Sequence, residues 1–129
     1  RPLGGRARAG LIMATILVVD DEPIIAMTMG DWLADLGHSV VGPATDYASA
    51  VALSEEAFDA AILDVSLGSE TTTGIAVRLS SRGVPFAVAS GHDAQSIDAA
   101  FANGLLLPKP FGFETFRRVV ERLLSPPHD

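Results

Sequence analysis

The sequence of 129 residues predicts one α/β domain in which five strands alternate with five helices. Short apolar runs bounded by polar residues recur along the chain, as in the buried strands of a parallel sheet. Segments with apolar residues at helical spacing lie between these runs. The connections are short enough for right-handed crossovers, which join the strands of a parallel sheet.

The first strand and helix are predicted from the segment that follows Ala14. Thr15–Asp20 is an apolar run that ends in acidic residues, and a tight turn leads into a helix over Pro23–Leu36. Proline suits the first helical position because its missing N–H would have no partner there. Gly37 is the expected stop. The apolar positions that we expect in the core are Ile25, Met29, Trp32, Leu33 and Leu36.

The second unit is a short strand over Ser39–Gly42, which Pro43 is expected to end. Thr45 or Asp46 can cap a second helix over about Tyr47–Ala57. This helix is rich in alanine, so we expect it to pack closely on the sheet.

The third strand is the apolar run from Ala60 to Asp64. A polar loop that contains glycine follows over Ser66–Gly74. A third helix is predicted over Ile75–Arg82, with Gly83 as its stop.

The remaining strands are predicted over Val84–Ala89 and Leu105–Leu107, and the remaining helices over Ala94–Asn103 and Glu114–Leu124. The last helix has the clearest apolar stripe, which consists of Phe116, Val119, Val120, Leu123 and Leu124. Five βα units in this order predict a flavodoxin-like fold. We expect a five-stranded parallel sheet of order 2-1-3-4-5 with helices on both faces.

The composition excludes several classes of protein. Apolar residues make up 48% of the chain and charged residues 19%, which is too apolar for a disordered chain. The formal net charge of −7 argues against a nucleic-acid partner, which needs a basic surface. The absence of cysteine excludes disulfides and zinc–thiolate sites. The longest apolar runs are far shorter than a membrane span, and no phosphate-binding glycine fingerprint follows the first strand.

The two ends of the chain differ from the predicted domain, which covers residues 13–125. Residues 1–12 are rich in glycine and arginine and lack the apolar stretch of a signal peptide. We interpret them as a disordered leader, a cloning remnant, or sequence upstream of a true start at Met13. A linker from an upstream domain or a small basic arm is the alternative. Residues 126–129 are predicted to be a tail, unless Pro126-Pro127 begins a linker.

Acidic side chains follow two of the predicted strands. Asp20 and Asp21 come after the first strand, and Asp64 ends the third. The carboxyl ends of parallel strands meet at one edge of the sheet, so we expect these carboxylates to lie close together. Crowded carboxylates raise one another's pKa unless a cation joins them, and Mg²⁺ prefers oxygen ligands. The sequence therefore predicts an Mg²⁺ site formed by Asp20, Asp21, Asp64 and the backbone carbonyl of Ser66.

Two further strand ends bring polar groups to the same edge: Ser90 and Lys109. With Mg²⁺ bound, Asp64 would be a carboxylate nucleophile able to accept a phosphoryl group. The Lys109 ammonium can stabilise negative charge on the phosphoryl oxygens, and the Ser90 hydroxyl can bind one of them afterwards. Singly, each residue also fits an ordinary turn former, helix cap or solvated lysine.

These residues resemble the receiver domain of bacterial two-component response regulators, and the resemblance covers Ala14–Leu124. The residues that carry it are Asp20, Asp21, Asp64, Ser90 and Lys109-Pro110-Phe111. It implies that Asp64 accepts a phosphoryl group from a sensor histidine kinase or a histidine phosphotransfer protein. It also implies a cis peptide between Lys109 and Pro110, a cytoplasmic protein and a signalling module rather than an enzyme. A downstream protein, or a second copy, would bind the face formed by the fourth helix, fifth strand and fifth helix.

Some positions depart from the usual receiver pattern. Leu106 occupies the place of a strand-five aromatic residue, and Ser90 replaces the commoner threonine. The loop after Asp64 is about two residues longer than in most receivers. The segment Val88–His92, after Pro85-Phe86, partly resembles the FATGUY receivers, which are often single domains in alphaproteobacteria.

Two other functions compete with this interpretation. A pseudo-receiver would bind its partner by shape alone, without phosphorylation of Asp64. An Mg²⁺-dependent phosphatase of the haloacid dehalogenase type also uses an aspartate nucleophile, but it needs a second aspartate at the position of Ser66.

Overall fold

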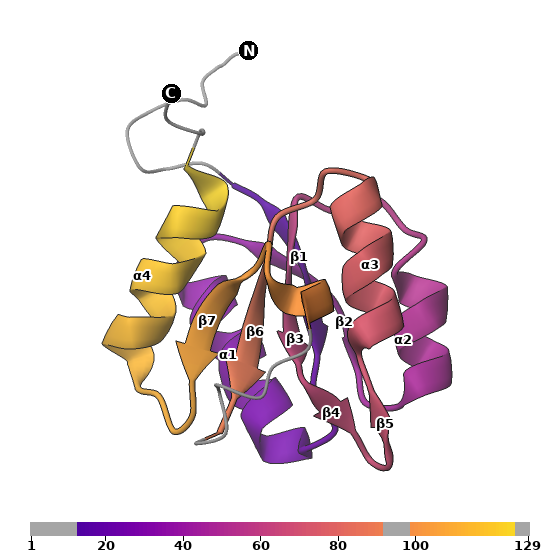
Figure 1. The fold of residues 1–129 in the computed structure, drawn as a ribbon. Coiled ribbons are helices and arrows are strands. Elements are labelled where there is room, and N and C mark those ends of the chain that lie inside the picture. Colours follow the sequence, from indigo (N-terminus) through magenta and orange to yellow (C-terminus); the bar gives the residue numbers. More distant parts are fainter. Residues whose placement is uncertain (1–12, 92–98, 126–129) are drawn as a thin grey trace.

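The computed structural model describes residues 13–91 and 99–125 (Figure 1). The predicted leader over residues 1–12, the tail over residues 126–129 and residues 94–98 of the predicted fourth helix lie outside the described residues. Within the described part of the chain, no helix is long and apolar enough to cross a bilayer.

The centre of the fold is a parallel sheet of five strands: β1 (Thr15–Val19), β2 (Ser39–Ala44), β3 (Ala60–Asp64), β6 (Phe86–Ser90) and β7 (Leu105–Pro108). Its order is β2-β1-β3-β6-β7, which confirms the predicted order 2-1-3-4-5. Every residue of β3 and of β6 is buried, as continuous apolar runs in a parallel sheet require.

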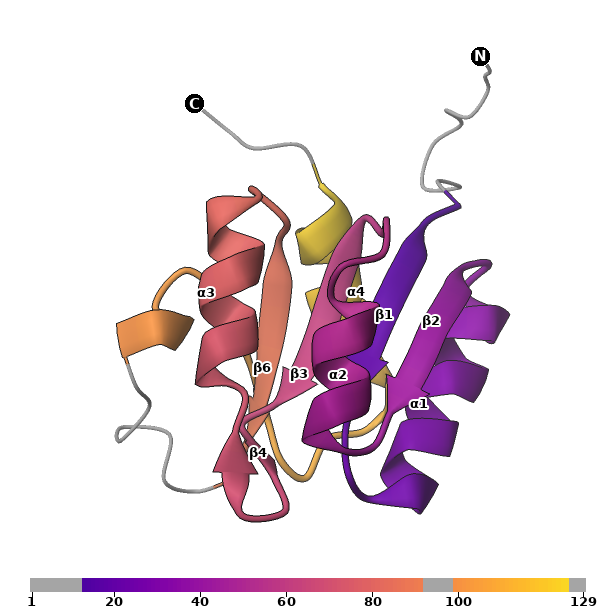
Figure 2. The same cartoon turned by 90° about the vertical axis from the view of Figure 1, so that its right-hand side faces the viewer.

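Helices cover both faces of the sheet, as predicted (Figures 1 and 2). They are α1 (Pro23–Asp35), α2 (Tyr47–Leu53), α3 (Thr73–Ser81) and α4 (Phe113–Leu124). In β1, Ile16 and Val18 face a core shared with α1 and α4. Leu17 and Val19 face a second core, shared with α2 and α3. Because β1 packs on both sides, its carboxyl end is held firmly where the acidic residues begin.

The prediction that Pro43 ends the second strand is wrong, because β2 continues through it to Ala44. Proline lacks an N–H and is tolerated where a strand has a free edge, and β2 is an edge strand. The peptide between Gly42 and Pro43 is cis, and the pairing with β1 is irregular at this point.

The prediction that the second helix reaches Ala57 is also wrong, because α2 ends at Leu53. Arg82, which follows α3, donates hydrogen bonds to the backbone carbonyls of Ser54 and Glu56. These carbonyls, which follow α2, are therefore hydrogen-bonded to Arg82 rather than within a longer helix.

The segment predicted as a loop after Asp64 contains a short antiparallel hairpin, β4 (Ser66–Leu67) and β5 (Glu70–Thr71). Gly68 lies in its turn with a φ of 59°, a conformation that favours glycine. Leu67 is buried against the core shared by α2 and α3, which fixes the hairpin to the domain.

The α-helix predicted over Ala94–Asn103 is wrong in its described part. Ala99–Phe101 is a short 3₁₀ helix, η3, whose backbone bonds join residues three apart. After η3, Gly104 lies against the ring of Phe86, where a Cβ would lie 2.5 Å from a ring carbon.

This contact predicts opposite effects of two glycine-to-alanine substitutions. Gly104→Ala should lower the free energy of unfolding by about 1–3 kcal/mol, because the added methyl group overlaps Phe86. Gly30→Ala in α1 should raise it by up to about 1 kcal/mol, because the site is open and alanine favours the helix. Urea unfolding of both variants measures the difference, and a neutral Gly104→Ala would contradict the packing described.

Candidate functional site

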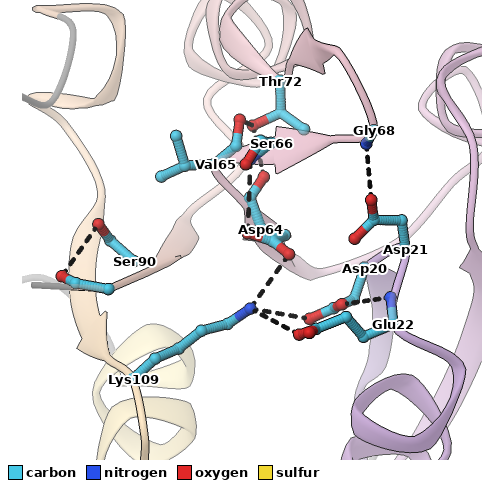
Figure 3. Close-up of polar contacts among 11 residues, drawn as sticks. Asp20, Asp21, Glu22, Asp64, Val65, Ser66, Gly68, Thr72, Ser90 and Lys109 are labelled. Atoms are coloured by element: carbon cyan, nitrogen blue, oxygen red, sulfur yellow. Dashed lines mark hydrogen bonds and ion pairs between the residues drawn. The ribbon is translucent and has the colours of Figure 1, made fainter. Parts of the chain in front are cut away.

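The carboxyl edge of the sheet brings together side chains that are far apart in the sequence (Figure 3). Asp20 follows β1 and Asp64 ends β3, and these two strands are neighbours. Lys109 follows β7, and its backbone N–H donates a hydrogen bond of 2.7 Å to the carbonyl of Ser90 at the end of β6. The strand order, rather than local sequence, thus creates the site.

Three carboxylates meet at this edge. One oxygen from each of Asp20, Asp21 and Asp64 lies within 4.8 Å of the others. Asp20 is fully buried and Asp64 is nearly so. The Asp20 Oδ1 atom accepts a hydrogen bond of 2.9 Å from the Glu22 N–H, and an Asp21 oxygen accepts one of 2.6 Å from the Gly68 N–H.

Lys109 supplies the positive charge. Its Nζ atom lies 3.1 Å from Asp64 Oδ2, 3.3 Å from Glu22 Oε1 and 3.7 Å from Asp20 Oδ2. Burial opposes its charge, but the hydrogen bond and attraction to Asp64, with help from Asp20 and Glu22, raise the pKa of the Lys109 ammonium overall. Glu22 directly follows the acidic pair in the sequence, but its contact with Lys109 is not predicted from the sequence.

The electrostatic balance at Asp20 is incomplete. Burial raises the pKa of the Asp20 carboxyl from 3.8 to about 6. The Glu22 N–H lowers this pKa, the Asp64 charge raises it and the Lys109 charge lowers it. Asp20 Oδ2 is buried and has no hydrogen-bond partner among the described residues. The Lys109 ammonium, 3.7 Å away, gives this oxygen an ion pair but no hydrogen bond, so within the described part of the chain a charged Oδ2 lacks the hydrogen-bond partner that a buried polar atom needs.

These observations fit a divalent metal ion. The donors are all oxygens, three carboxylates converge, and one buried oxygen lacks a hydrogen bond. Mg²⁺ is a hard cation that prefers oxygen ligands and binds one or two carboxylates together with water. Asp20, Asp21 and Asp64 would therefore hold such an ion directly or through water.

The two serines of the predicted site lie differently. Ser66 is exposed in β4, and its N–H lies 3.4 Å from Asp64 Oδ1. The role of its backbone carbonyl stays a prediction. The Ser90 hydroxyl is nearly buried, and its described contact is a 3.5 Å hydrogen bond to the Gly91 carbonyl. Among the described contacts, the hydroxyl does not reach Asp64 or Lys109, and its role stays a prediction.

The sequence matches the family model of the response regulator receiver domain over residues 16–121. The chain belongs to the response regulator receiver family. Receivers are signalling modules of two-component systems rather than classical enzymes, and the family generally binds Mg²⁺ and acts through kinases or downstream proteins. The predicted cis peptide between Lys109 and Pro110 is confirmed.

Solved structures support the same conclusion. The receiver is 38% identical to SdrG from Sphingomonas melonis Fr1, with a TM-score of 0.75 over 88% of this chain and 98% of that chain. It is 31% identical to the chemotaxis response regulator CheY4 of Vibrio cholerae, with a TM-score of 0.73 over 87% of this chain and 99% of that chain. The response regulator PhyR from Brucella abortus shares the fold at 23% identity and a TM-score of 0.76, over 88% of this chain and 48% of that chain. Among curated proteins, the sequence has no significant match. The finer resemblance to FATGUY receivers stays a prediction.

The raised pKa of Asp20 predicts a pH-dependent stability. The Asp20 carboxyl binds its proton more tightly in the folded receiver than in the unfolded chain. The free energy of unfolding therefore falls as the pH rises from 3.8 to about 6. Without metal, Asp20→Asn should therefore raise the free energy of unfolding at pH 7 by about 1–2 kcal/mol, and this gain should vanish below about pH 4.

Urea unfolding in a chelating buffer across this pH range measures the effect. Asp31→Asn, at an exposed position on α1, is the matched control and should change little. If Asp20→Asn is no more stable than wild type at pH 7, the charged Asp20 carboxylate does not destabilise the metal-free fold, and the prediction is wrong.

Proposed function

We propose that this receiver accepts a phosphoryl group on Asp64 in an Mg²⁺-dependent reaction. The observation that carries the proposal is the position of the Lys109 ammonium, 3.1 Å from the Asp64 carboxylate and inside a cluster of three converging aspartates. The donor would be the phosphohistidine of a sensor histidine kinase or of a histidine phosphotransfer protein, as the family resemblance implies. The reaction would take place in the cytoplasm, which the resemblance also implies.

Asp64 is suited to act as the nucleophile. In the proposed step, one of its carboxylate oxygens forms a bond to phosphorus while the phosphorus–nitrogen bond of phosphohistidine breaks. The bonding electron pair stays on the imidazole nitrogen, which takes up a proton, and Asp64 becomes an acyl phosphate. The side chain is nearly buried at the end of β3, so its position is well defined before the donor arrives.

Charge stabilisation comes from the groups around Asp64. Mg²⁺, held by Asp20, Asp21, Asp64 and the Ser66 carbonyl, would neutralise charge on the carboxylates and on the transferred group. Lys109 already contacts the nucleophile and can follow the negative charge as it moves onto the phosphoryl oxygens. The Ser90 hydroxyl, one strand away, can donate a hydrogen bond to one of these oxygens and move the end of β6 inward.

The output would be read by a protein partner. The surface beside the site is formed by η3, β7 and α4, the described part of the face predicted to dock a downstream protein or a second copy. Leu106 on β7 is 45% exposed there, at the position where many receivers carry an aromatic residue. Arg117 on α4 is paired with Glu114 and Glu121, so this helix presents an ordered charged surface.

Intact-mass spectrometry with acetyl phosphate as the donor tests the proposal. The wild-type protein should gain one phosphoryl group when Mg²⁺ is present and none in a chelating buffer. Asp64→Asn should gain none, while Asp35→Asn, an exposed aspartate at the end of α1, should behave as wild type.

Absence of an adduct can mean either a short-lived acyl phosphate or no phosphorylation, and measuring the release of inorganic phosphate distinguishes the two. Steady release of inorganic phosphate that depends on Asp64 indicates a short-lived acyl phosphate and supports the proposal. Neither adduct nor release, in a folded protein that binds Mg²⁺, would favour a pseudo-receiver.

A further inference from the structure

Thr72 contacts the backbone of the proposed phosphoacceptor. It is fully buried between β5 and α3, and its hydroxyl donates a hydrogen bond of 2.7 Å to the backbone carbonyl of Asp64. The same hydroxyl lies 3.3 Å from the Val65 carbonyl, which also accepts a bond of 2.9 Å from the Thr72 N–H (Figure 3). Thr72 thus holds both carbonyls at the point where β3 ends.

The Thr72 hydroxyl binds the Asp64 carbonyl instead of capping the helix that Thr72 precedes. Thr72 is the N-cap residue of α3, where a threonine side chain ordinarily accepts a hydrogen bond from the first turn of the helix. Here no such side-chain cap is present, because the hydroxyl is turned toward Asp64. The Thr72 carbonyl still accepts the Ala76 N–H at 3.0 Å, so the residue joins α3 directly to the phosphoacceptor strand.

The hairpin between Asp64 and Thr72 is also tied at its tip. The Gly68 N–H donates its 2.6 Å hydrogen bond to the Asp21 carboxylate, on the other side of the acidic cluster. The segment therefore spans the site, with Thr72 holding one end at β3 and Gly68 holding the tip at the turn before α1. A change at either anchor would move the aspartates relative to each other.

We propose that Thr72 is a positioning residue for Asp64, whose hydroxyl fixes the backbone that aims the carboxylate at the metal site and at Lys109. The inference rests on the proposed function for its effect on phosphorylation, but its effect on Mg²⁺ binding stands without it. An Asp side chain has few rotatable bonds, so a small rotation of its backbone moves the carboxylate. Errors of about 1 Å in such groups can cost up to about a hundredfold in rate.

Thr72→Val tests the role of the hydroxyl. Valine has nearly the same shape and keeps the backbone N–H bond to Val65, but it cannot donate to the Asp64 carbonyl. We expect phosphorylation by acetyl phosphate to slow by about tenfold, and the dissociation constant for Mg²⁺ alone to rise by about threefold or more. Thr72→Ser keeps the donor and should restore both values to within about twofold of wild type.

Thr71→Val is the matched control, because Thr71 is exposed on β5 and its hydroxyl contacts only that of Thr73 among the described residues. Calorimetry gives the Mg²⁺ affinity, and intact-mass time courses give the rate, at a temperature where each variant is folded. Wild-type values for a folded Thr72→Val would overturn the inference, whatever its melting temperature. If Thr72→Val does not fold, Thr72→Cys, a much weaker donor, replaces it in the comparison with Thr72→Ser.

The outcomes separate the two proposals. A wild-type protein that is never phosphorylated contradicts the proposed function, while the Mg²⁺ affinities still decide the role of Thr72. If the wild-type protein is phosphorylated and Thr72→Val matches it in both phosphorylation rate and Mg²⁺ affinity, only the positioning role is contradicted.

Discussion

The candidate site of this receiver depends on the attraction between one ammonium group and the carboxylates around it. The Lys109 Nζ atom lies within 4 Å of oxygens from Asp20, Glu22 and Asp64. Among the described residues, it is the positively charged group that forms ion pairs with this cluster. One positive charge cannot balance these carboxylates. Burial, helped by the negative charges of Asp64 and Glu22, raises the pKa of Asp20. The site therefore favours a divalent cation and a reaction in which negative charge must be stabilised.

The sheet makes this attraction possible. Asp20, Asp64 and Lys109 are separated by more than forty residues from one to the next, but parallel pairing brings their strand ends to one edge. β6 lies between β3 and β7, so the lysine must reach across the strand that carries Ser90. A phosphoryl group on Asp64 would then lie among residues from four different strand ends. In the proposed function, the change in charge at Asp64 would act on β6 and on the neighbouring face of η3, β7 and α4.

The sequence predicts the strands, because each is a short apolar run bounded by polar residues or proline, and it places Asp20, Asp64 and Lys109 at or just after strand ends. The strand order follows from the flavodoxin-like fold that five βα units predict. The sequence does not predict the β4–β5 hairpin, since Ser66–Thr71 has the composition of an ordinary loop and its structure depends on Leu67 burial and on the Gly68 bond to Asp21. In the described part of the predicted fourth helix, Ala99–Phe101 is a 3₁₀ helix, and apolar spacing does not distinguish this short helix from an α-helix. The contact from Thr72 to Asp64 was missed for a similar reason: a threonine before a helix indicates a cap, and only tertiary structure turns its hydroxyl elsewhere.

The most direct test of the charge balance is the Mg²⁺ affinity of Lys109→Met, measured by calorimetry at pH 7 beside the wild-type protein. Methionine keeps an unbranched side chain and removes the charge, so the carboxylates lose the cation that competes with the metal. The account predicts that Mg²⁺ binds the variant about tenfold more tightly and that the metal-free variant is less stable than wild type. Equal or weaker Mg²⁺ binding by the variant would contradict the view that Lys109 and the metal balance the same carboxylates.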